Sequence, residues 1–231
     1  MLASVPQNTM SSSVPAPQPS DPKSLVEYGY DQIAPRYLAW SAPRPTTTRM
    51  HYLEKLISIL PAGASCLELG CGAGVPCTQA LVARGFAVTG NDISASQIEL
   101  AKEHVPQATL IQGDMLALDF QQGSFDAVVA FYSIFHLPGQ EQGMLVEKVT
   151  GWLKEGGWFL FNLATNEGDV LVDDWMGVKM FSSGLGVEGN REMMRVGGKG
   201  LKVVEDEVAM EMVGRIEEKF HWVLAQKVEV P

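Results

Sequence analysis

Apolar residues follow two spacings along this chain, and the two spacings alternate. Five short apolar runs have the length of buried strands, and other segments repeat apolar residues every three or four positions, as one face of a helix does. These patterns predict strands at residues 64–69, 86–92, 108–112, 124–132 and 158–163, and helices at residues 49–60, 75–84, 94–104 and 140–153. Residues 201–212 and 219–227 have the composition of two further strands.

Strands that alternate with helices predict an α/β fold, because right-handed crossovers place helices on both faces of one sheet. We expect a Rossmann-like, seven-stranded, mostly parallel sheet with helices between the first five strands and an antiparallel strand at the C-terminal end. Residues 164–189 show no regular pattern and are expected to be irregular, with a short helix at residues 190–196. We expect residues 164–198 to form an insertion between the fifth and sixth expected strands.

The first 60 residues change character at Lys23. Residues 1–22 hold five prolines and five serines with few large apolar side chains, so we expect a disordered tail in front of one domain, residues 23–231. From Lys23 to Trp40, aromatic residues recur near helical spacing, and Pro35 should kink or divide this helix. Residues 41–45 are expected to form a loop. One interpretation is that this segment is an amphipathic helix that only covers the hydrophobic core.

Composition narrows the classes of partner. The 231 residues carry a net charge of −10 and no basic run, which disfavours a nucleic-acid partner. The most apolar run, Phe125–Leu137, is interrupted by polar residues, so we expect no membrane span. No targeting signal is visible before Lys23, and we expect a cytoplasmic protein, monomeric or homodimeric. Cys66, Cys71 and Cys77 lack zinc-site spacing and are expected to be reduced and buried, with no metal bound.

The chain is organised around the stretch Leu67–Gly74, which follows the first expected strand and precedes a helix. Gly70, Gly72 and Gly74 leave room for the backbone to turn sharply or to lie close to a ligand. A dinucleotide-binding fingerprint counted from Gly70 requires a third glycine at the position of Val75, so the pattern departs from that fingerprint.

Glu68, the glycines that follow it and Val75 together resemble the first motif of the class I S-adenosylmethionine-dependent methyltransferases. The resemblance covers Tyr28 to Lys227. It implies S-adenosyl-L-methionine as the cofactor, S-adenosyl-L-homocysteine as the product, and a small organic acceptor methylated on O, N or S. In that family the glycine turn passes under the methionine part of the cofactor, and Glu68 would bond within the turn and toward the methionine amino group. Alternatively, Glu68 is a solvated acid or a helix cap.

Two further acids follow the second and third expected strands. Asp92 lies 22 residues after Gly70, where a carboxylate can accept hydrogen bonds from both ribose hydroxyls. It could instead cap the next helix, but Ser94 fills that role, with Gln97 completing a capping box. Asp114 could be a turn former; the resemblance assigns it to the adenine amino group. The cofactor-binding residues implied are Tyr37, Glu68, Gly70, Cys71, Gly72, Asp92, Ile93, Gln97, Asp114, Met115 and Phe131.

The segment from Tyr30 to Tyr37 is similar to the entry segment of small-molecule methyltransferases, in particular the ubiquinone and menaquinone type. It would make residues 23–60 a helical lid over the cofactor. The resemblance also places residues 164–198 on the substrate side, and the acceptor-pocket residues implied are Tyr30, Trp40, Tyr132, Trp175 and Met180.

His136 follows the fourth expected strand and is the candidate general base, because an unperturbed imidazole titrates near neutrality. It could equally be an ordinary loop histidine, and Tyr132 and Ser133 are weaker candidates. Two rival functions stay open. A nucleotide-dependent oxidoreductase is disfavoured by Val75 and by the absence of a Tyr-x-x-x-Lys pair after the fourth strand. A protein that binds the cofactor without moving its methyl group, either a pericyclase-like enzyme or a regulator, fits the same motifs.

Overall fold

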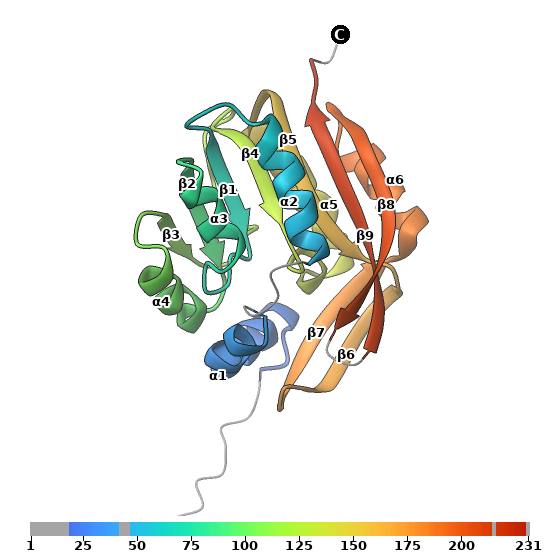
Figure 1. Ribbon diagram of the computed structural model, residues 1–231. Coiled ribbons are helices and arrows are strands. Elements are labelled where there is room, and N and C mark those ends of the chain that lie inside the picture. The colour runs from blue at the N-terminus through green and yellow to red at the C-terminus, as the bar shows by residue number, and fades with distance from the viewer. Residues whose placement is uncertain (1–18, 42–46, 214–215, 230–231) are drawn as a thin grey trace, which may run out of the picture.

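The computed structural model describes residues 19–41, 47–213 and 216–229, so most of the expected tail lies outside the described residues, as does the loop expected at residues 41–45 except for Ser41. Its main sheet has seven strands in the order β3-β2-β1-β4-β5-β9-β8 (Figure 1). The first five strands run parallel and β9 is antiparallel to β5, which confirms the expected fold class. The strands are β1 (Ser65–Leu69), β2 (Ala87–Asp92), β3 (Thr109–Gln112), β4 (Phe125–Ala130), β5 (Leu153–Ala164), β8 (Leu201–Val213) and β9 (Ile216–Lys227).

Helices cover both faces of this sheet because strand side chains alternate between the faces. Leu67 and Leu69 of β1 pack on the face that carries α5 (Gly139–Trp152) and α6 (Gly186–Gly197). Cys66 packs on the opposite face, against α2 (Thr48–Ile59) and α3 (Cys77–Ala83). The helix α4 (Ala95–His104) packs against β2, β3 and α1 (Pro22–Ser41).

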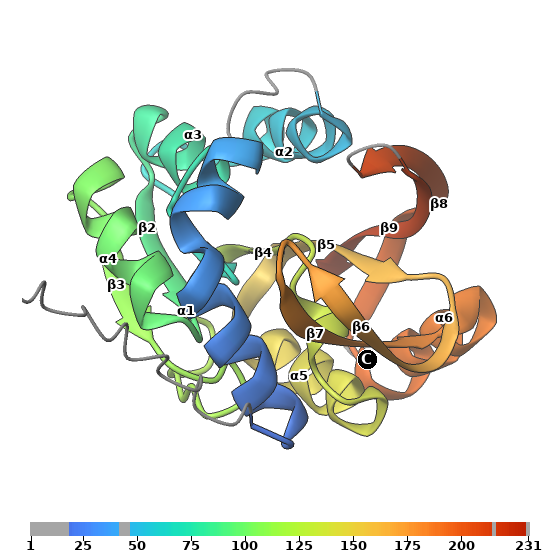
Figure 2. The same ribbon diagram turned by 90° about the horizontal axis from the view of Figure 1, so that it is seen from below.

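Helix α1 lies across the carboxyl ends of the parallel strands, beside β7 (Val178–Leu185) (Figures 1 and 2). Pro35 was expected to kink or divide this helix, but α1 runs through it as one element. Proline removes one backbone hydrogen bond. The neighbouring Ile33 and Ala34 are fully buried, and their packing holds the helix together across that loss.

The structure differs most from the expectation at residues 164–189, which were expected to be irregular. They form a second, two-stranded antiparallel sheet of β6 (Glu167–Trp175) and β7 (Val178–Leu185), and α6 begins at Gly186, four residues before the expected helix. Almost every residue of β6 is exposed, so the strand has no apolar alternation to reveal it. Two smaller expectations were also wrong. The segment between β3 and β4 contains no helix, and β5 begins at Leu153, five residues before the strand expected at residues 158–163.

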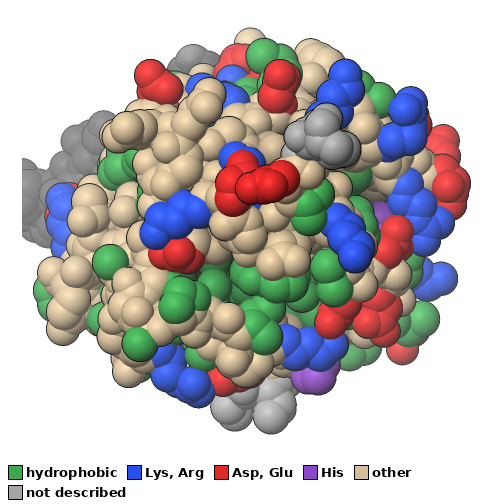
Figure 3. All heavy atoms as spheres, turned by 90° about the horizontal axis from the view of Figure 1, so that it is seen from above, with side chains coloured by type: hydrophobic (Ala, Val, Ile, Leu, Met, Phe, Trp, Pro, Cys, Tyr) green, Lys and Arg blue, Asp and Glu red, His purple; other side chains and the backbone are tan. Residues whose placement is uncertain are grey.

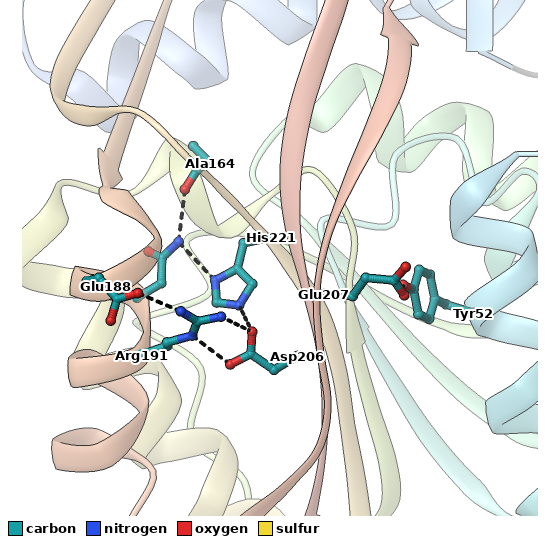
Figure 4. Close-up of polar contacts among 8 residues, drawn as sticks. Tyr52, Ala164, Glu188, Arg191, Asp206, Glu207 and His221 are labelled. Atoms are coloured by element: carbon teal, nitrogen blue, oxygen red, sulfur yellow. Dashed lines mark hydrogen bonds and ion pairs between the residues drawn. The ribbon is translucent and has the colours of Figure 1, made fainter.

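The edge hairpin β8–β9 is fixed to α6 by a polar cluster (Figure 4). Arg191 of α6 donates two hydrogen bonds to Asp206 of β8, at 2.9 and 2.8 Å, and buried His221 of β9 lies 2.9 Å from the same carboxylate. These contacts lower the pKa of Asp206 to about 2, because the bonds from Arg191 favour its charged form. The cluster therefore links the hairpin to α6 at the edge of the sheet.

Charges are mixed where the parallel strands begin. On that face, lysine and arginine side chains are scattered among aspartates and glutamates (Figure 3). No helix within the described residues is long and apolar enough to cross a membrane. The three cysteines are free and buried, as expected.

Candidate active site

The glycine turn between β1 and α3 is held against the ends of β2 and β4. Gly70 and Cys71 both donate backbone hydrogen bonds to the carbonyl oxygen of Asn91, at 2.8 Å. Gly70 has a φ of 74°, and a Cβ placed on it would lie 2.4 Å from Cβ of Ser133. Only glycine fits both the backbone conformation and this close approach. The turn therefore exposes backbone, not side chains, at the carboxyl edge of the sheet.

Asp92 at the end of β2 is buried and locked onto this turn. Its Oδ2 accepts a hydrogen bond from the Gly72 N–H at 2.8 Å, and its Oδ1 accepts one from the Ser94 N–H at 3.0 Å. Burial raises its pKa to about 6, although these backbone bonds oppose the shift. Each carboxylate oxygen has capacity for a further donor. Asp92 is thus a positioned acceptor that lines a cavity with Gly70 and Gly72.

The expected capping box is only half present. Ser94 accepts the Gln97 N–H at 3.1 Å, as predicted, but the Ser94 N–H is bound by Asp92 and not by Gln97. Ser94 is therefore the N-cap of α4, as expected, while Asp92 in place of the Gln97 side chain accepts the second hydrogen bond of the box. Among the described residues, the buried amide atoms Oε1 and Nε2 of Gln97, which lines the cavity, have no hydrogen-bond partner. An unpaired buried amide is costly, so a polar ligand that satisfied it would be stabilised there.

Asp114, after β3, is engaged from both sides. Its Oδ1 accepts the Leu116 N–H at 2.9 Å, and its Oδ2 lies 2.7 Å from the ammonium of Lys23 in α1. Lys23 also pairs with Glu141 of α5 at 2.9 Å. Sequence reasoning missed Lys23, since its partner Asp114 is 91 residues away and nothing local marks the pair.

Glu68 does not bond the glycine turn as the resemblance implies. It shares a face of the sheet with Cys66, and its carboxylate accepts a 2.5 Å hydrogen bond from the Thr78 hydroxyl in α3. Burial raises the pKa of Glu68 to about 7. Glu68 lines a pocket of about 30 Å³ behind the turn, which Cys71 and Arg49 also line.

His136 ends a short 3₁₀ helix (Ile134–His136) after β4, with both ring nitrogens engaged. Nδ1 lies 2.7 Å from the carbonyl oxygen of Phe181, which can only accept, so Nδ1 carries the proton. Nε2 then accepts a hydrogen bond from the Tyr30 hydroxyl at 3.0 Å. Burial lowers the pKa of His136 to about 4, so the ring is neutral at pH 7.

Two larger cavities adjoin His136 and share four lining side chains. The first, about 70 Å³, is lined by the glycine turn. The second, about 510 Å³, is lined by residues of α1, α2 and the two hairpins β6–β7 and β8–β9, whose arrangement Figure 2 shows. Both are lined by Tyr30, Tyr37, Tyr132 and His136.

Nine of the eleven residues expected at the cofactor line the first cavity, and the other two, Glu68 and Cys71, line the pocket behind the turn. All five residues expected at the acceptor line the second cavity. Sequence reasoning missed the contribution of α2 and of the edge hairpin to that wall, which includes Arg49, Met210, Glu211, Met212 and Phe220. No periodicity marks these positions as a shared surface.

Helix α1 is closed over the first cavity. Asp31 of α1 accepts hydrogen bonds from the Ser94 hydroxyl at 2.6 Å and the Ser96 N–H at 3.0 Å. A space of about 70 Å³ holds only a few water molecules. The polar groups suit an adenosyl group, because the turn exposes backbone, Asp92 offers acceptor sites and the Gln97 amide lacks a partner. The first cavity also shares lining residues with the larger cavity and with the pocket behind the turn, so a ligand as large as an adenosyl group would extend beyond it.

The strand order, the antiparallel β9 and the carboxylates at the ends of the first three strands define the class I methyltransferase fold. Residues 66–157 match the protein family described as a methyltransferase domain. The chain is 31% identical over 166 residues to the 27-O-demethylrifamycin SV methyltransferase of Amycolatopsis mediterranei. The matched region is 68% of this chain and 54% of that protein.

Solved structures agree on the fold. One is a Methanosarcina mazei protein described as a SAM-dependent methyltransferase, with a TM-score of 0.67 at 18% sequence identity. The superposed region is 80% of this chain and 99% of the Methanosarcina chain. The [4+2]-cyclase SpnF has a TM-score of 0.64 at 16% identity, with coverages of 88% and 95%. The chain belongs to the class I S-adenosylmethionine-dependent methyltransferases, whose cofactor is S-adenosylmethionine. It spans about a quarter to a half of the length of the first curated relatives that it matches.

Proposed function

We propose that this protein transfers the methyl group of S-adenosylmethionine to an O, N or S atom of a small organic acceptor. The observation that carries the proposal is the meeting of two cavities at Tyr30, Tyr37, Tyr132 and His136. One cavity has the glycine turn and acids suited to the cofactor. The other is large enough for a small organic molecule, and aromatic side chains from α1 and the hairpins form much of its wall.

The cofactor supplies an activated methyl group on a sulfonium. Asp92 and Gln97 would hold its ribose, and Asp114 and Met115 would face its adenine. Tyr132 supports this junction with a left-handed backbone, φ 52°, stabilised by the bond from its N–H to Asn162 at 2.7 Å. Strain of this kind is characteristic of sites that must hold one geometry.

The side chains at the junction contribute alignment and exclusion of water, which together account for roughly 7–11 kcal/mol of a barrier in favourable cases. His136 in this state is a better hydrogen-bond acceptor than a base. Full proton transfer from a phenol of pKa about 10 to an imidazole of pKa about 4 costs about 8 kcal/mol. His136 would therefore orient Tyr30 or an acceptor hydroxyl through Nε2, and its role as a general base requires the acceptor to change its surroundings.

Residues 23–60 would act as the lid and residues 164–198 as the substrate-side insertion. Helix α1 covers the first cavity, and Trp175, Met180 and Ser182 from β6 and β7 line the second. The ubiquinone and menaquinone subtype is the first to test, because flat phenolic acceptors suit a wall of aromatic rings.

The direct test measures S-adenosylhomocysteine released with a panel of phenols, quinols, amines and thiols. The wild-type protein should release it with at least one class of acceptor, and Asp92→Ala should release much less. Binding of S-adenosylmethionine without turnover on any acceptor would favour the second candidate, a non-methylating cofactor binder. The likeness to the cyclase SpnF supports keeping that candidate, because one fold serves both chemistries.

A further inference from the structure

The edge hairpin β8–β9 contributes two glutamates to the wall of the second cavity. Glu211 of β8 and Glu218 of β9 both line this cavity of about 510 Å³. They are also directly opposite each other in the antiparallel ladder of the two strands. Cross-strand partners project from the same face of a sheet, with their Cβ atoms about 4.5–5.5 Å apart. Two carboxylates therefore stand side by side in the cavity wall.

These two charges lack the cationic partners that other acids of the hairpin have. Glu205 and Asp206 of β8 form ion pairs with a lysine and an arginine, at 3.1 and 2.8 Å. Among the described residues, no ion pair reaches Glu211 or Glu218. Like charges directly opposite each other destabilise a sheet. A positively charged ligand bound between the two carboxylates would relieve this repulsion.

Glu211 also determines what Tyr132 offers to the cavity. The Tyr132 hydroxyl donates a hydrogen bond to Oε2 of Glu211 at 2.6 Å, and the indole N–H of buried Trp222 donates to Oε1 at 2.9 Å. A hydroxyl has one proton, so the Tyr132 oxygen can only accept further hydrogen bonds. Tyr132 lines both larger cavities. Their junction therefore presents a hydrogen-bond acceptor next to a carboxylate, which suits a nucleophile that carries hydrogens and a positive charge.

Aromatic rings form much of the remaining wall. Trp40 of α1 and Trp175 of β6 contact each other edge to face with centroids 5.7 Å apart, and Phe220 of β9 contacts Tyr132 at 5.1 Å. All four line the cavity. The face of an aromatic ring attracts a cation, most strongly for tryptophan. Arg49 is the only lysine or arginine among the described lining residues, so negative charge exceeds positive charge in this wall.

We propose that the methyl acceptor is a basic amine, which enters the second cavity as an ammonium ion and is held by Glu211, Glu218 and the Tyr132 oxygen. The inference rests on the proposed function and narrows the acceptor atom to nitrogen. The ammonium ion gives one proton to bulk water, which frees the nitrogen lone pair. That lone pair forms the new N–C bond as the C–S bond breaks, and the electron pair of the broken bond stays on sulfur. The products are the methylated ammonium ion and neutral-sulfur S-adenosylhomocysteine.

Two pairs of probes differ only in the charged group: 2-phenylethylamine with 2-phenylethanol, and tryptamine with tryptophol. Calorimetry at low salt compares their binding to the full chain saturated with S-adenosylhomocysteine. In at least one pair the amine should bind at least about tenfold more tightly than its alcohol, through charged hydrogen bonds and the aromatic rings. In turnover with S-adenosylmethionine, that amine should release S-adenosylhomocysteine and its alcohol should not.

Glu218→Gln tests the carboxylate pair at an exposed position, where the fold should tolerate the change. It should weaken amine binding about 3- to 10-fold, the range for a partly solvated charge pair, and change alcohol binding less than twofold. The matched control is Glu217→Gln. It removes the same charge one residue away, but successive side chains of a strand point to opposite faces, so both affinities should stay within twofold.

Tyr132→Phe removes the accepting oxygen and should also weaken the amine more than the alcohol. The proposal is overturned if no amine binds more tightly than its alcohol, including the case in which none of the four probes binds. The neutral quinol of the ubiquinone and menaquinone subtype would then be the favoured acceptor. Equal losses in Glu218→Gln and Glu217→Gln would also overturn it, because the effect would then come from net charge alone. Failure of the proposed function is distinct: the protein would not bind S-adenosylhomocysteine, or would release no product with any class of acceptor.

Discussion

Glu68→Gln should make the ligand-free protein more stable and its cofactor binding weaker. Burial raises the pKa of Glu68 to about 7 from its ordinary 4.5. The folded state therefore binds an extra proton between these values, and stability is lost as pH rises through this window. The difference of about 2.5 pKa units corresponds to roughly 3 kcal/mol at pH 8, a large fraction of a typical folding free energy. Glutamine avoids this cost, and its carbonyl can still accept the Thr78 hydroxyl.

Urea unfolding of the ligand-free protein at pH 8 and pH 5 provides the assay. Glu68→Gln should raise the free energy of unfolding by up to about 3 kcal/mol at pH 8 and by much less at pH 5, where the wild-type carboxyl is already protonated. Glu54→Gln, at a half-exposed site paired with Arg84, is the control and should change stability by less than about 1 kcal/mol at either pH. Equal effects of Glu68→Gln at both pH values, or destabilisation at pH 8, would refute the reasoning.

Three further substitutions probe the site. Asp92→Ala should weaken S-adenosylhomocysteine binding by about 1–3 kcal/mol in calorimetry, through lost charged hydrogen bonds; unchanged affinity would remove Asp92 from the site. His136→Gln should lower turnover without moving its pH profile between pH 6 and 9, since a group with a pKa of about 4 does not titrate there; a lost limb in that profile would instead identify a base. Lys23→Met removes the bridge from α1 to Asp114 and Glu141 and should speed S-adenosylhomocysteine release several-fold in stopped-flow fluorescence; an unchanged rate would exclude this bridge as a lid contact.

The pattern of the sequence predicted the parts of the fold that are organised locally. Buried parallel strands such as β4 are almost wholly apolar, and Asp92 and Asp114 follow strands whose carboxyl ends must meet at one edge. Strand β6 escaped prediction because its pairing with β7 is made by backbone atoms, while its side chains face solvent.

The site residues could be predicted where they lie in one continuous segment, as Gly70 does in the glycine turn. They could not be predicted where distant segments come together. Only folding places Arg49 of α2 in the same pocket as Glu68 and in the same cavity wall as the edge hairpin. Only folding likewise brings Lys23 to its ion-pair partner Asp114. The partner of Glu68 was misjudged for a related reason. Alternation along β1 turns its side chain toward α3 and Thr78, on the far side of the glycine turn.

A crystal structure with S-adenosylhomocysteine bound would test the central claim most directly. We predict the ribose hydroxyls on the Asp92 carboxylate, the adenine beside Asp114 and Met115, and the amino-acid arm over Gly70 and Gly72. Density for the ligand at another surface of the protein, with none at the glycine turn, would contradict the account.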